Sequence, residues 1–456
     1  MGLRAAVRVR NTTRSQRRLQ SLCLIVALVF LYDQRVRNEQ APALFASSLH
    51  SAAAPIRCAP EKYRVDELQY VSDMRVFHSA IQVVHRYEFQ PSKERPNWQM
   101  VRNTKRNPEF WDLAKNKLTE NCGRYQGLCQ CSVRRSIGMI RCAYVDSGVD
   151  MPGQVFDREH VFPVHPFIWN LTANASHQIV THAQLANGLS VYGSAFAHAS
   201  IEILPQLLHL LQHIPKSVPI LVDMNGSGGK WVDILNQLGL SDPERWVALQ
   251  KSTIYFARQL YFNIVEVRSA YAQPSREWKL LREEEPCSWR TSIPSHIVRA
   301  TFCKPVSPLV RSSEQKKRIA VIHRREVKSR QIENHVELYR SLSEALPDHI
   351  VMEFIGDEHT LLESIALFCS IDVLVAPHGA GLIYMQFLPE NAAVIEIGYA
   401  STEVMKWPID YYAGNALVLN LRYYLSVAKG GYLTSLQADV DDVLSLTRAA
   451  LEPINS

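Results

Sequence analysis

Blocks of apolar and polar residues alternate along the second half of the chain and predict strands and helices in turn. Apolar runs predict strands at residues 319–323, 350–355, 371–376 and 392–397. Apolar residues at helical spacing predict intervening helices at residues 333–346, 360–369 and 380–388. Strict alternation of this kind is typical of a parallel, doubly wound sheet.

A comparable rhythm precedes this half. Residues 195–212 have apolar positions at helical spacing, and a short strand at 218–222, a glycine-rich turn and a helix at 231–238 follow. Further strand pieces are expected at residues 246–250, 254–256 and 263–267. We therefore predict an α/β protein with two Rossmann-like domains, joined by a proline-rich, charged linker at 283–308.

The first forty residues carry the formal charge of the whole protein. They contain eight arginines against Asp33 and Glu39, and this net of +6 equals the formal charge of all 456 residues. The other 416 residues (456 − 40) therefore balance to zero. This removes the basic surface that binding to a nucleic acid needs, so no nucleic-acid partner is expected.

An apolar run from Leu19 to Tyr32 follows this basic head. Arginines before such a run are the positive-inside arrangement, which predicts an uncleaved membrane anchor with the body on the luminal side. The run is shorter than the ~20 residues of a usual span, so a cleaved signal peptide and an organellar transit sequence stay open as alternatives.

Cysteines and sequons also fit a luminal body. The cysteines beyond the anchor are Cys58, Cys122, Cys129, Cys131, Cys142, Cys287, Cys303 and Cys369. An even count is compatible with disulfides, and the four between 122 and 142 are expected to staple a small extension, with a zinc site as the alternative. One interpretation of Cys369, in an apolar helix, is a buried thiol. The glycosylation sequons are Asn170, Asn174 and Asn225.

Residues 373–396 read as strand, glycine turn, helix and strand, with polar groups at both strand ends. The turn consists of His378, Gly379, Ala380 and Gly381. Its glycines let a phosphate approach the backbone where the N–H groups of a helix start converge. Glu396, at the end of the next strand, is a candidate acceptor for ribose hydroxyls. The segment therefore predicts a nucleotide-sugar pocket at the carboxyl edge of a sheet.

Arginines that precede this segment are candidates for the same pocket. Arg324 and Arg325 follow the first strand of the second half, and Arg330 lies in the turn before the next helix. Guanidinium groups suit phosphate oxygens because they donate paired hydrogen bonds, whereas surface ion pairs with nearby acids are the alternative. Asn334 is a further candidate, although a hydrogen bond at the helix start is the favoured interpretation.

Three blocks of the sequence resemble glycosyltransferase family 61. HGAGL, then FLP, then a strand ending in Glu, within residues 378–396, is similar to the family signature. IAVIHRREVKSRQIENHVEL at 319–338 resembles its arginine-rich turn, and HASIEILPQLL at 198–208 is a looser match. The resemblance implies a GT-B-like fold, with two Rossmann-like domains facing a cleft, and an inverting transfer from a UDP-sugar. Family members use xylose, N-acetylglucosamine or arabinose.

Such a transfer needs a base that deprotonates the acceptor hydroxyl. His198 and Glu202 lie four residues apart on one helix face and can act as base and orienting partner. A helix-surface pair without catalytic role is the alternative. Asp223, at a strand end, is a second candidate.

Two look-alikes of metal or phosphate motifs are not counted as sites. Asp439 and Asp441 have the D-x-D form, but they begin the last helix, 440–451, where acids complement the helix dipole. Residues 226–230 fail the P-loop spacing and indicate a tight strand-to-helix turn. We therefore predict that neither a metal nor a cofactor is required, the UDP-sugar being a substrate.

The expected enzyme is an inverting glycosyltransferase, single-pass in the Golgi or endoplasmic-reticulum membrane, that acts on a glycan or glycoprotein hydroxyl. The alternative is a catalytically inactive luminal binding protein of the same fold. The expected parts are a cytosolic tail (1–18), an anchor (19–32), a stem (33–60), a cysteine-containing extension (61–180), an acceptor-side domain (181–300), a nucleotide-sugar domain (316–425) and a C-terminal helix (426–456).

Overall fold

The computed structural model describes residues 58, 68–71, 79–89, 131–147, 153–162, 164, 177–190, 193–269, 279–280, 295–303, 316–325, 329–399, 412, 415–416 and 418–452. The chain divides into two compact units, Met1–Arg57 and Cys58–Ser456, and all described residues belong to the second. The expected tail, the anchor and the sequons Asn170 and Asn174 lie outside the described residues. Within the described ranges, no helix is long and apolar enough to cross a membrane.

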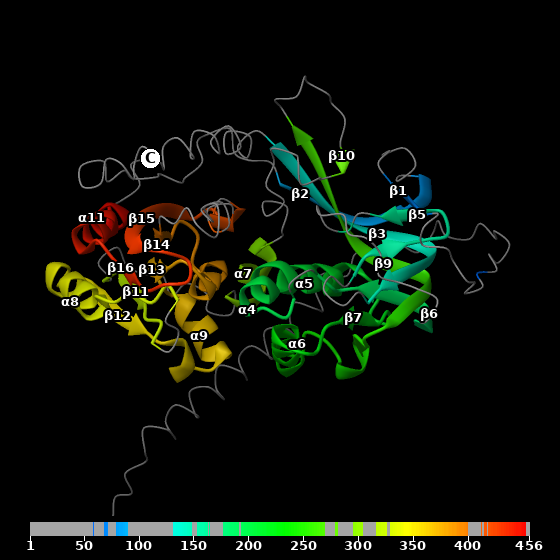
Figure 1. Ribbon diagram of the computed structural model, residues 1–456, viewed down its shortest axis with the longest axis horizontal. Helices are drawn as coiled ribbons and strands as arrows, with labels where there is room; N and C mark the ends of the chain where they lie inside the picture. Colours follow the sequence, from blue (N-terminus) through cyan, green and yellow to red (C-terminus); the bar gives the residue numbers. More distant parts are fainter. Residues whose placement is uncertain are drawn as a thin grey trace, which may run out of the picture. The chain divides into compact units, whose positions relative to one another are not determined.

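Two sheets organise the described part of the chain (Figure 1). The strands of the first sheet are β1 (Gln69–Tyr70), β2 (Gln82–Phe89), β3 (Cys131–Asp146), β4 (Val155–Phe156), β5 (His160–Phe162), β6 (Gln178–Asn187), β7 (Ile220–Val222), β8 (Trp246–Ala248), β9 (Thr253–Ser269) and β10 (Lys279–Leu280). The helical segments that go with it are α4 (Phe196–His198), the π-helical turn η2 (Ala199–Ile203), α5 (Leu204–His213), α6 (Ser227–Gln237), the 3-10 turn η3 (Pro243–Arg245) and α7 (Ser295–Phe302).

Part of the first sheet is Rossmann-like, as predicted. Strands β8, β7, β6 and β9 are neighbours in that order and run parallel, which is the 3-2-1-4 order of a Rossmann half-sheet. The strand pieces expected at 254–256 and 263–267 are in fact one strand, β9. Polar Gln259 does not end the strand, because its side chain accepts a hydrogen bond of 2.6 Å from Gln184 on β6.

The structure does not separate the expected extension (61–180) from the expected first domain (181–300). Strand β3, from the extension, pairs antiparallel with β9 from Cys131↔Ser269 to Asp146↔Ile254. The expected boundary at 180 also falls inside β6. Pairing between residues more than 100 positions apart leaves no local periodic signal, so the extension and the first domain form one sheet.

The second sheet has the order β12-β11-β13-β14-β15-β16, and its strands run parallel up to β15. They are β11 (Arg318–Ile322), β12 (Ile350–Phe354), β13 (Val373–Pro377), β14 (Ala393–Tyr399), β15 (Arg422–Gly430) and β16 (Leu436–Gln437), the last antiparallel to β15. Its helical segments are α8 (His335–Ala345), the 3-10 turn η5 (Gly356–Glu358), α9 (Leu361–Phe368), the 3-10 helix η6 (Ala380–Phe387) and α11 (Val440–Leu451). The predicted doubly wound sheet is confirmed.

Two details of this half differ from expectation. The helix expected at 380–388 is a 3-10 helix, and strand β15 crosses the expected boundary between 425 and 426. Helix α11 buries Val443 and Leu446 in the same apolar cluster as Ile319 of β11. The C-terminal residues that the structure describes are therefore part of the second sheet domain and not an appendage.

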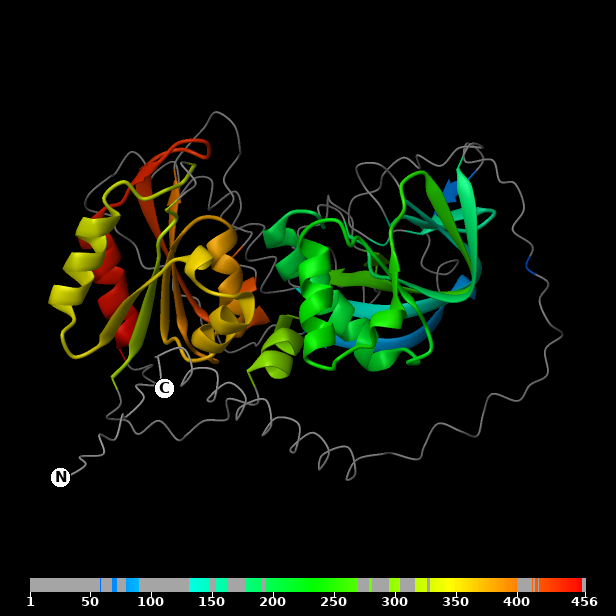
Figure 2. The ribbon, with the colours of Figure 1, turned by 90° about the horizontal axis from the view of Figure 1, so that it is seen from below.

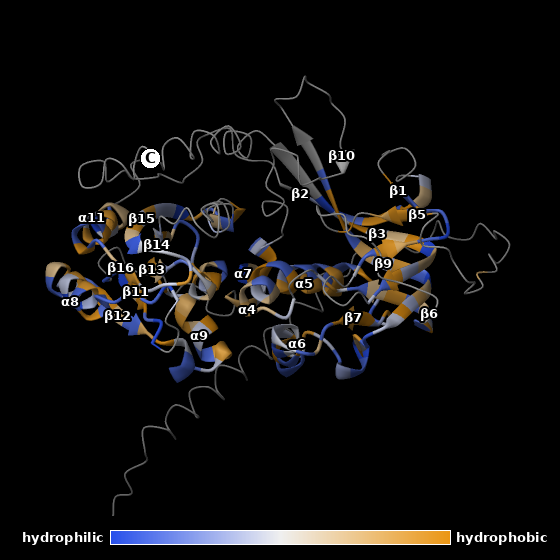
Figure 3. Ribbon diagram, in the orientation of Figure 1, coloured by the Kyte–Doolittle hydropathy of each residue, from blue (hydrophilic) through white to orange (hydrophobic). Residues whose placement is uncertain are grey.

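Helices cover both faces of the second sheet (Figure 2). Helices α8 and α11 pack on one face, and α9 and η6 pack on the other. The apolar cluster of the second face continues into α5, α6 and α7 of the first half. In Figure 3 the paired parts of β3 and β9 are mainly hydrophobic, as expected of strands that supply a core.

Two disulfides tie the described part together, and both correct an expectation. Cys142 pairs with Cys58 and not with its neighbours in the 122–142 group. Cys369, at the end of α9, pairs with Cys303 just after α7, so it is not a free buried thiol. Sequence spacing gives no guide to either pairing, since each joins residues 84 or 66 positions apart.

Candidate active site

The candidate site lies where the order of the second sheet reverses. Strand β11 is followed by β12 on one side, whereas β13 and β14 continue on the other side. In parallel sheets of this kind, ligands bind outside the carboxyl ends of the strands at the point of reversal. Arg324 follows β11, and His378 and Gly379 follow β13, so both loops meet there.

Gly379 leaves room for two guanidinium groups. Its φ is +141°, and a Cβ at this position would overlap Nη1 of Arg324 and lie 3.4 Å from Nη1 of Arg330. The predicted arginines 324 and 330 therefore converge on the predicted glycine turn. Gly381 has another role, because a Cβ there would press at 3.0 Å on the side chain of Ile322 in β11.

The two arginines form a site of concentrated positive charge. The Nε atoms of Arg324 and Arg330 are buried, and neither has a hydrogen-bond partner among the described residues. Burial and the neighbouring charge of Arg330 lower the pKa of Arg324 below its ordinary value. Two like charges in a half-buried position are stabilised by an anion between them.

The backbone of Arg330 is held in a conformation that favours this placement. Its φ is +58°, which is uncommon for a residue with a side chain, and its N–H donates to the Thr434 carbonyl at 2.5 Å. Its guanidinium lies 4.5 Å from the ring centroid of Tyr432, a cation–π arrangement.

His378 is fixed by a buried carboxylate. Its Nδ1 lies 2.5 Å from Oε1 of Glu396, and the Tyr423 hydroxyl donates to the other oxygen, Oε2, at 2.6 Å. Because an ionised carboxylate only accepts hydrogen bonds, Nδ1 of His378 carries a proton and Nε2 is left for a ligand. The Tyr412 hydroxyl donates to the Gly379 carbonyl at 2.6 Å and holds the turn itself.

These contacts correct the role expected for Glu396. The residue is 1% exposed and both carboxylate oxygens are engaged within the protein, so it does not face ribose hydroxyls. It orients His378 instead. Tyr412, Tyr423 and Tyr432 were not among the expected site residues. Tyrosines are frequent in this part of the sequence. Tyr423 lies on strand β15, which the sequence did not predict, so its place beside Glu396 was not expected.

Arg325 and Asn334 lie outside the convergence. Arg325 is exposed and pairs with Glu358 at 2.9 Å, which is the surface ion pair kept as an alternative. The Asn334 side chain donates to the Ala438 carbonyl and accepts from the Ala438 N–H, both at 3.0 Å. It stands at the N-cap of α8 as expected, but its side chain makes no capping hydrogen bond to that helix and instead binds the backbone of Ala438.

The candidate base belongs to the first half. Nδ1 of His198 lies 2.7 Å from Oε1 of Glu202, and their side chains are 30% and 1% exposed. Glu202 also raises the pKa of Arg135 on β3, although burial dominates and lowers that pKa to about 10. The predicted pair is therefore present, with the imidazole at the surface and a buried carboxylate behind it. Arg135 was missed, because β3 pairs with a distant part of the chain.

Glu202 lies in the π-helical turn η2, which interrupts an otherwise continuous helix. The N–H of Leu204 reaches back five residues to the Ala199 carbonyl. Pro205 follows at once, and proline can donate no hydrogen bond to a preceding turn, so it accounts for the widening. Single π-turns of this kind are frequent at functional sites.

The remaining candidates have structural roles. The Asp223 carboxylate accepts a hydrogen bond of 3.0 Å from the Asn225 N–H and shapes the turn before α6. Asp439 is the N-cap of α11 and accepts from the Asp442 N–H at 3.0 Å, as expected from its place at the helix start. Helix α6 begins at Ser227 with Gly226 as its N-cap, so residues 227–230 form the first helical turn, and the expected turn at 226–230 and helix start at 231 are corrected.

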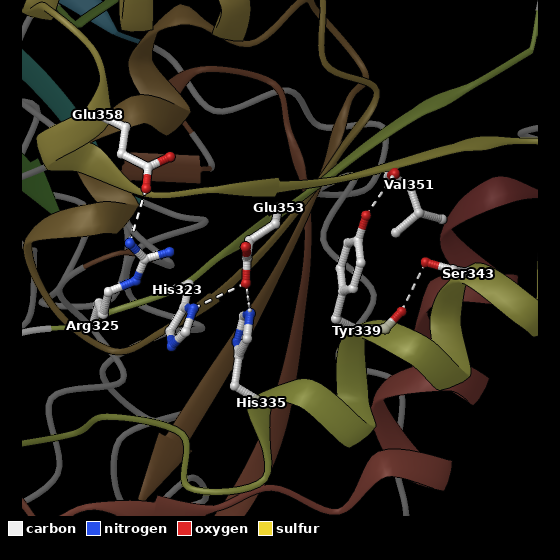
Figure 4. A network of polar contacts seen from close by, with 8 residues as sticks. All are labelled: His323, Arg325, His335, Tyr339, Ser343, Val351, Glu353 and Glu358. Carbon is white, nitrogen blue, oxygen red and sulfur yellow. Dashed lines mark hydrogen bonds and ion pairs between the residues drawn. The ribbon is translucent and has the colours of Figure 1, made fainter.

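Two groups of side chains in the described ranges have the donors to hold a metal ion. In one, His323 and His335 both contact Oε1 of Glu353, at 2.9 and 2.8 Å (Figure 4). The other consists of His85, His209 and His213. Neither group includes the arginines or His378 of the candidate site.

A parallel sheet whose switch point gathers two arginines, a buttressed histidine and an unhindered glycine turn is typical of an enzyme that transfers groups from nucleotide donors. Residues 196–395 match the family model Glycosyltransferase 61. The match runs from α4 into β14 and includes His198, Glu202, Arg324, Arg330 and His378. Residues 196–395 are therefore a glycosyltransferase family 61 domain, and the chain is a glycosyltransferase. A comparison with curated proteins finds no match.

Proposed function

We propose that the chain is an inverting glycosyltransferase of GT-B arrangement that moves a sugar from a UDP donor to a hydroxyl of a glycan or glycoprotein in the secretory pathway. The observation that carries this proposal is the pair of half-buried guanidiniums over Gly379, beside His378. A departing diphosphate supplies the anion that this charge requires. Xylose, N-acetylglucosamine and arabinose are the donor sugars to test.

The donor half acts by holding the leaving group. Arg324 and Arg330 donate to the diphosphate oxygens, and Nε2 of His378 donates to the same group or to the sugar. Glu396 keeps the His378 ring in place through the contact at Nδ1. As the bond from the anomeric carbon to the diphosphate oxygen breaks, these groups stabilise the charge that develops on the oxygen.

The acceptor half supplies the base. The half-buried ring of His198 accepts the proton of the acceptor hydroxyl at Nε2, because its Nδ1 is occupied by Glu202. The buried Glu202 carboxylate orients the ring and stabilises the imidazolium that forms. The acceptor oxygen then attacks the anomeric carbon from the face opposite the diphosphate, which inverts its configuration.

We infer that this chemistry proceeds without a metal at the diphosphate. The two guanidiniums supply the positive charge that a divalent cation supplies in D-x-D enzymes, and Asp439 of the D-x-D look-alike is engaged as a helix cap. The enzyme should therefore keep its transfer rate in EDTA, and adding Mn²⁺ should not raise it. Activity lost in EDTA and restored by Mn²⁺ would show that a metal serves the leaving group.

One experiment tests the function. Residues 56–456 are incubated with a panel of UDP-sugars, and donor hydrolysis, transfer and product linkage are measured. We expect one donor to turn over, with Glu202→Gln and His198→Ala lowering kcat about 10²-fold or more and with similar donor binding. The control is Asp223→Asn, which changes a turn residue and should leave kcat within about threefold. Donor binding without turnover in the wild type supports the inactive binding protein instead.

The cellular setting is part of the same proposal. The basic head and the apolar run from Leu19 to Tyr32 support a location in the Golgi or endoplasmic-reticulum membrane with the body in the lumen. The two disulfides suit that oxidising compartment. Asn225, the one sequon inside the described ranges, is exposed and free to be glycosylated.

A further inference from the structure

Three imidazoles from two separate elements meet on the first sheet. His209 and His213 lie four residues apart on one face of α5, and His85 approaches them from strand β2. Nδ1 of His85 is 2.9 Å from Nε2 of His209, and the rings of His85 and His213 stack with centroids 3.4 Å apart. One nitrogen from each residue lies within 4.8 Å of the others.

The backbone of β2 is irregular next to His85. The pairing of β2 with β3 shifts register between Val83 and His85, which marks a bulge. A bulge places an extra residue in one strand and changes the direction of the side chains around it. Here it accompanies the one histidine that the strand directs at α5.

The cluster brings nitrogen donors together at a buried position. His209 is fully buried, and His85 and His213 flank its ring. An imidazole binds a metal through the lone pair of an unprotonated ring nitrogen, and each of the three residues can offer one.

A second contact fixes which nitrogen of His209 faces the cluster. Its Nδ1 lies 3.4 Å from Oδ1 of Asn263 on β9, so Nδ1 is the proton donor and Nε2 presents its lone pair to His85. Metal-bound histidines use their other ring nitrogen in this way, and the partner sets the tautomer.

The group of His323, His335 and Glu353 is a weaker candidate for a metal site. In that group the Glu353 carboxylate already accepts a hydrogen bond from both imidazoles (Figure 4), so its polar atoms are satisfied without an ion. Among the described residues, no carboxylate forms an ion pair with His85, His209 or His213. Nitrogen donors alone select a borderline transition metal over Mg²⁺ or Ca²⁺.

We propose that His85, His209 and His213 bind one divalent transition-metal ion, Zn²⁺ in the cell, which fastens strand β2 to helix α5. Two imidazole nitrogens on a tetrahedral Zn²⁺, at about 2.0–2.1 Å each, lie about 3.3 Å apart, which is near the 2.9 Å between Nδ1 of His85 and Nε2 of His209. A fourth position goes to water. The proposed ion has a structural role and takes no part in the transfer reaction. Its ligands include neither the residues that bind the diphosphate nor the candidate base.

Zn²⁺ binding to the full-length protein tests this inference without any measurement of activity. The protein is purified in detergent, stripped with a chelator, titrated with Zn²⁺ and analysed for bound metal and for its unfolding temperature. We expect about one Zn²⁺ per chain and a rise in Tm of about 4 °C or more at saturating Zn²⁺. His213→Ala, at a half-exposed position, should bind no Zn²⁺ and show no rise.

The matched control is His323→Ala, which removes one histidine of the other group. It should bind Zn²⁺ and gain Tm as the wild type does. Retention of the metal in His213→Ala with its loss in His323→Ala would assign the ion to the other group and overturn the inference. So would a wild-type protein that binds no Zn²⁺ at about 100 μM. Should His213→Ala unfold, His85→Gln on the edge strand gives the same comparison.

Discussion

Glu396 orients the imidazole ring of His378, and both of its own carboxylate oxygens are engaged within the protein. Its carboxylate is buried between the imidazole of His378 and the hydroxyl of Tyr423. We predict that Glu396→Gln lowers kcat/KM about 10- to 100-fold, because a neutral amide replaces the carboxylate that orients His378 toward the charge developing on the diphosphate.

Tyr423→Phe is the matched control for that substitution. It removes the hydrogen bond to Oε2 of Glu396 but keeps the carboxylate beside His378. Its effect on kcat/KM should be several-fold smaller than that of Glu396→Gln. Equal losses in the two variants would mean that Glu396 acts through packing and not through charge.

Arg330 and Arg325, both near the switch point, differ in their surroundings, so their substitution should affect UDP binding differently. Arg330→Lys keeps a positive charge but loses the paired donors, so the affinity for UDP should fall about tenfold. Arg325→Ala removes an exposed ion pair with Glu358, and such pairs contribute about 0–1 kcal/mol. Its UDP affinity should stay within about threefold of the wild type, as measured by calorimetry.

A similar loss in both variants would contradict this division of roles. It would indicate that UDP is attracted by the summed charge of the loop rather than by the guanidinium that lies over Gly379. Raising the ionic strength separates the two cases further, because exposed charges are screened more strongly than buried ones.

The π-helical turn η2 places the candidate base, and Pro205 accounts for the turn. We predict that Pro205→Ala keeps or raises the Tm while kcat falls about tenfold. Alanine supplies an N–H to the preceding turn and lets the helix return to regular α-geometry, which shifts His198 against Glu202. Thermal unfolding and turnover are measured on the same preparation.

Pro347→Ala serves as the comparison, since Pro347 is exposed and lies in the loop between α8 and β12. It should alter neither kcat nor Tm beyond error. A normal kcat in Pro205→Ala would show that the geometry of the π-turn is not needed for the reaction.

Elements with a complete local pattern were predictable. The last helix was expected at 440–451, where α11 is found, because its apolar spacing and its acidic start agree. The long strand β9 and its partner β3 were not seen as a pair. Their match depends on residues far apart in sequence, and polar positions such as Gln259 are satisfied across the sheet.

The candidate site divides in the same way. Arg330, His378 and Gly379 could be identified from their position at strand ends, where parallel sheets bind ligands. The role of Glu396 could not, because it depends on register. Glu396 pairs with Ala376 on one side and with Leu425 on the other, which places it between His378 and Tyr423. Only the paired strands show that its oxygens are already engaged.

Contacts between the two sheet domains lie next to the candidate base and next to the glycine turn of the donor site. Nε2 of Gln386, in the helix that follows the glycine turn, donates to the Ser200 carbonyl at 3.0 Å, two residues before Glu202. The Cys303–Cys369 disulfide joins the ends of α7 and α9, and the ring of Trp231 in α6 contacts that of Phe387 in η6. The base-bearing turn and the donor turn thus share one apolar cluster, which favours a fixed relation between them.

Membrane attachment is the last prediction, and it rests on how charge is distributed over the whole chain. Because residues 41–456 have no net charge, their summed charge gives no attraction to an anionic membrane surface. We therefore predict that attachment comes from the run Leu19 to Tyr32. In secretory cells the full chain should resist alkaline carbonate extraction, whereas a chain with residues 1–40 replaced by a cleavable signal should be secreted in active form. Asn225→Gln should shorten the glycan shift of both forms by one unit. A full chain that carbonate releases, with a new N-terminus after Tyr32, would identify the run as a cleaved signal peptide instead.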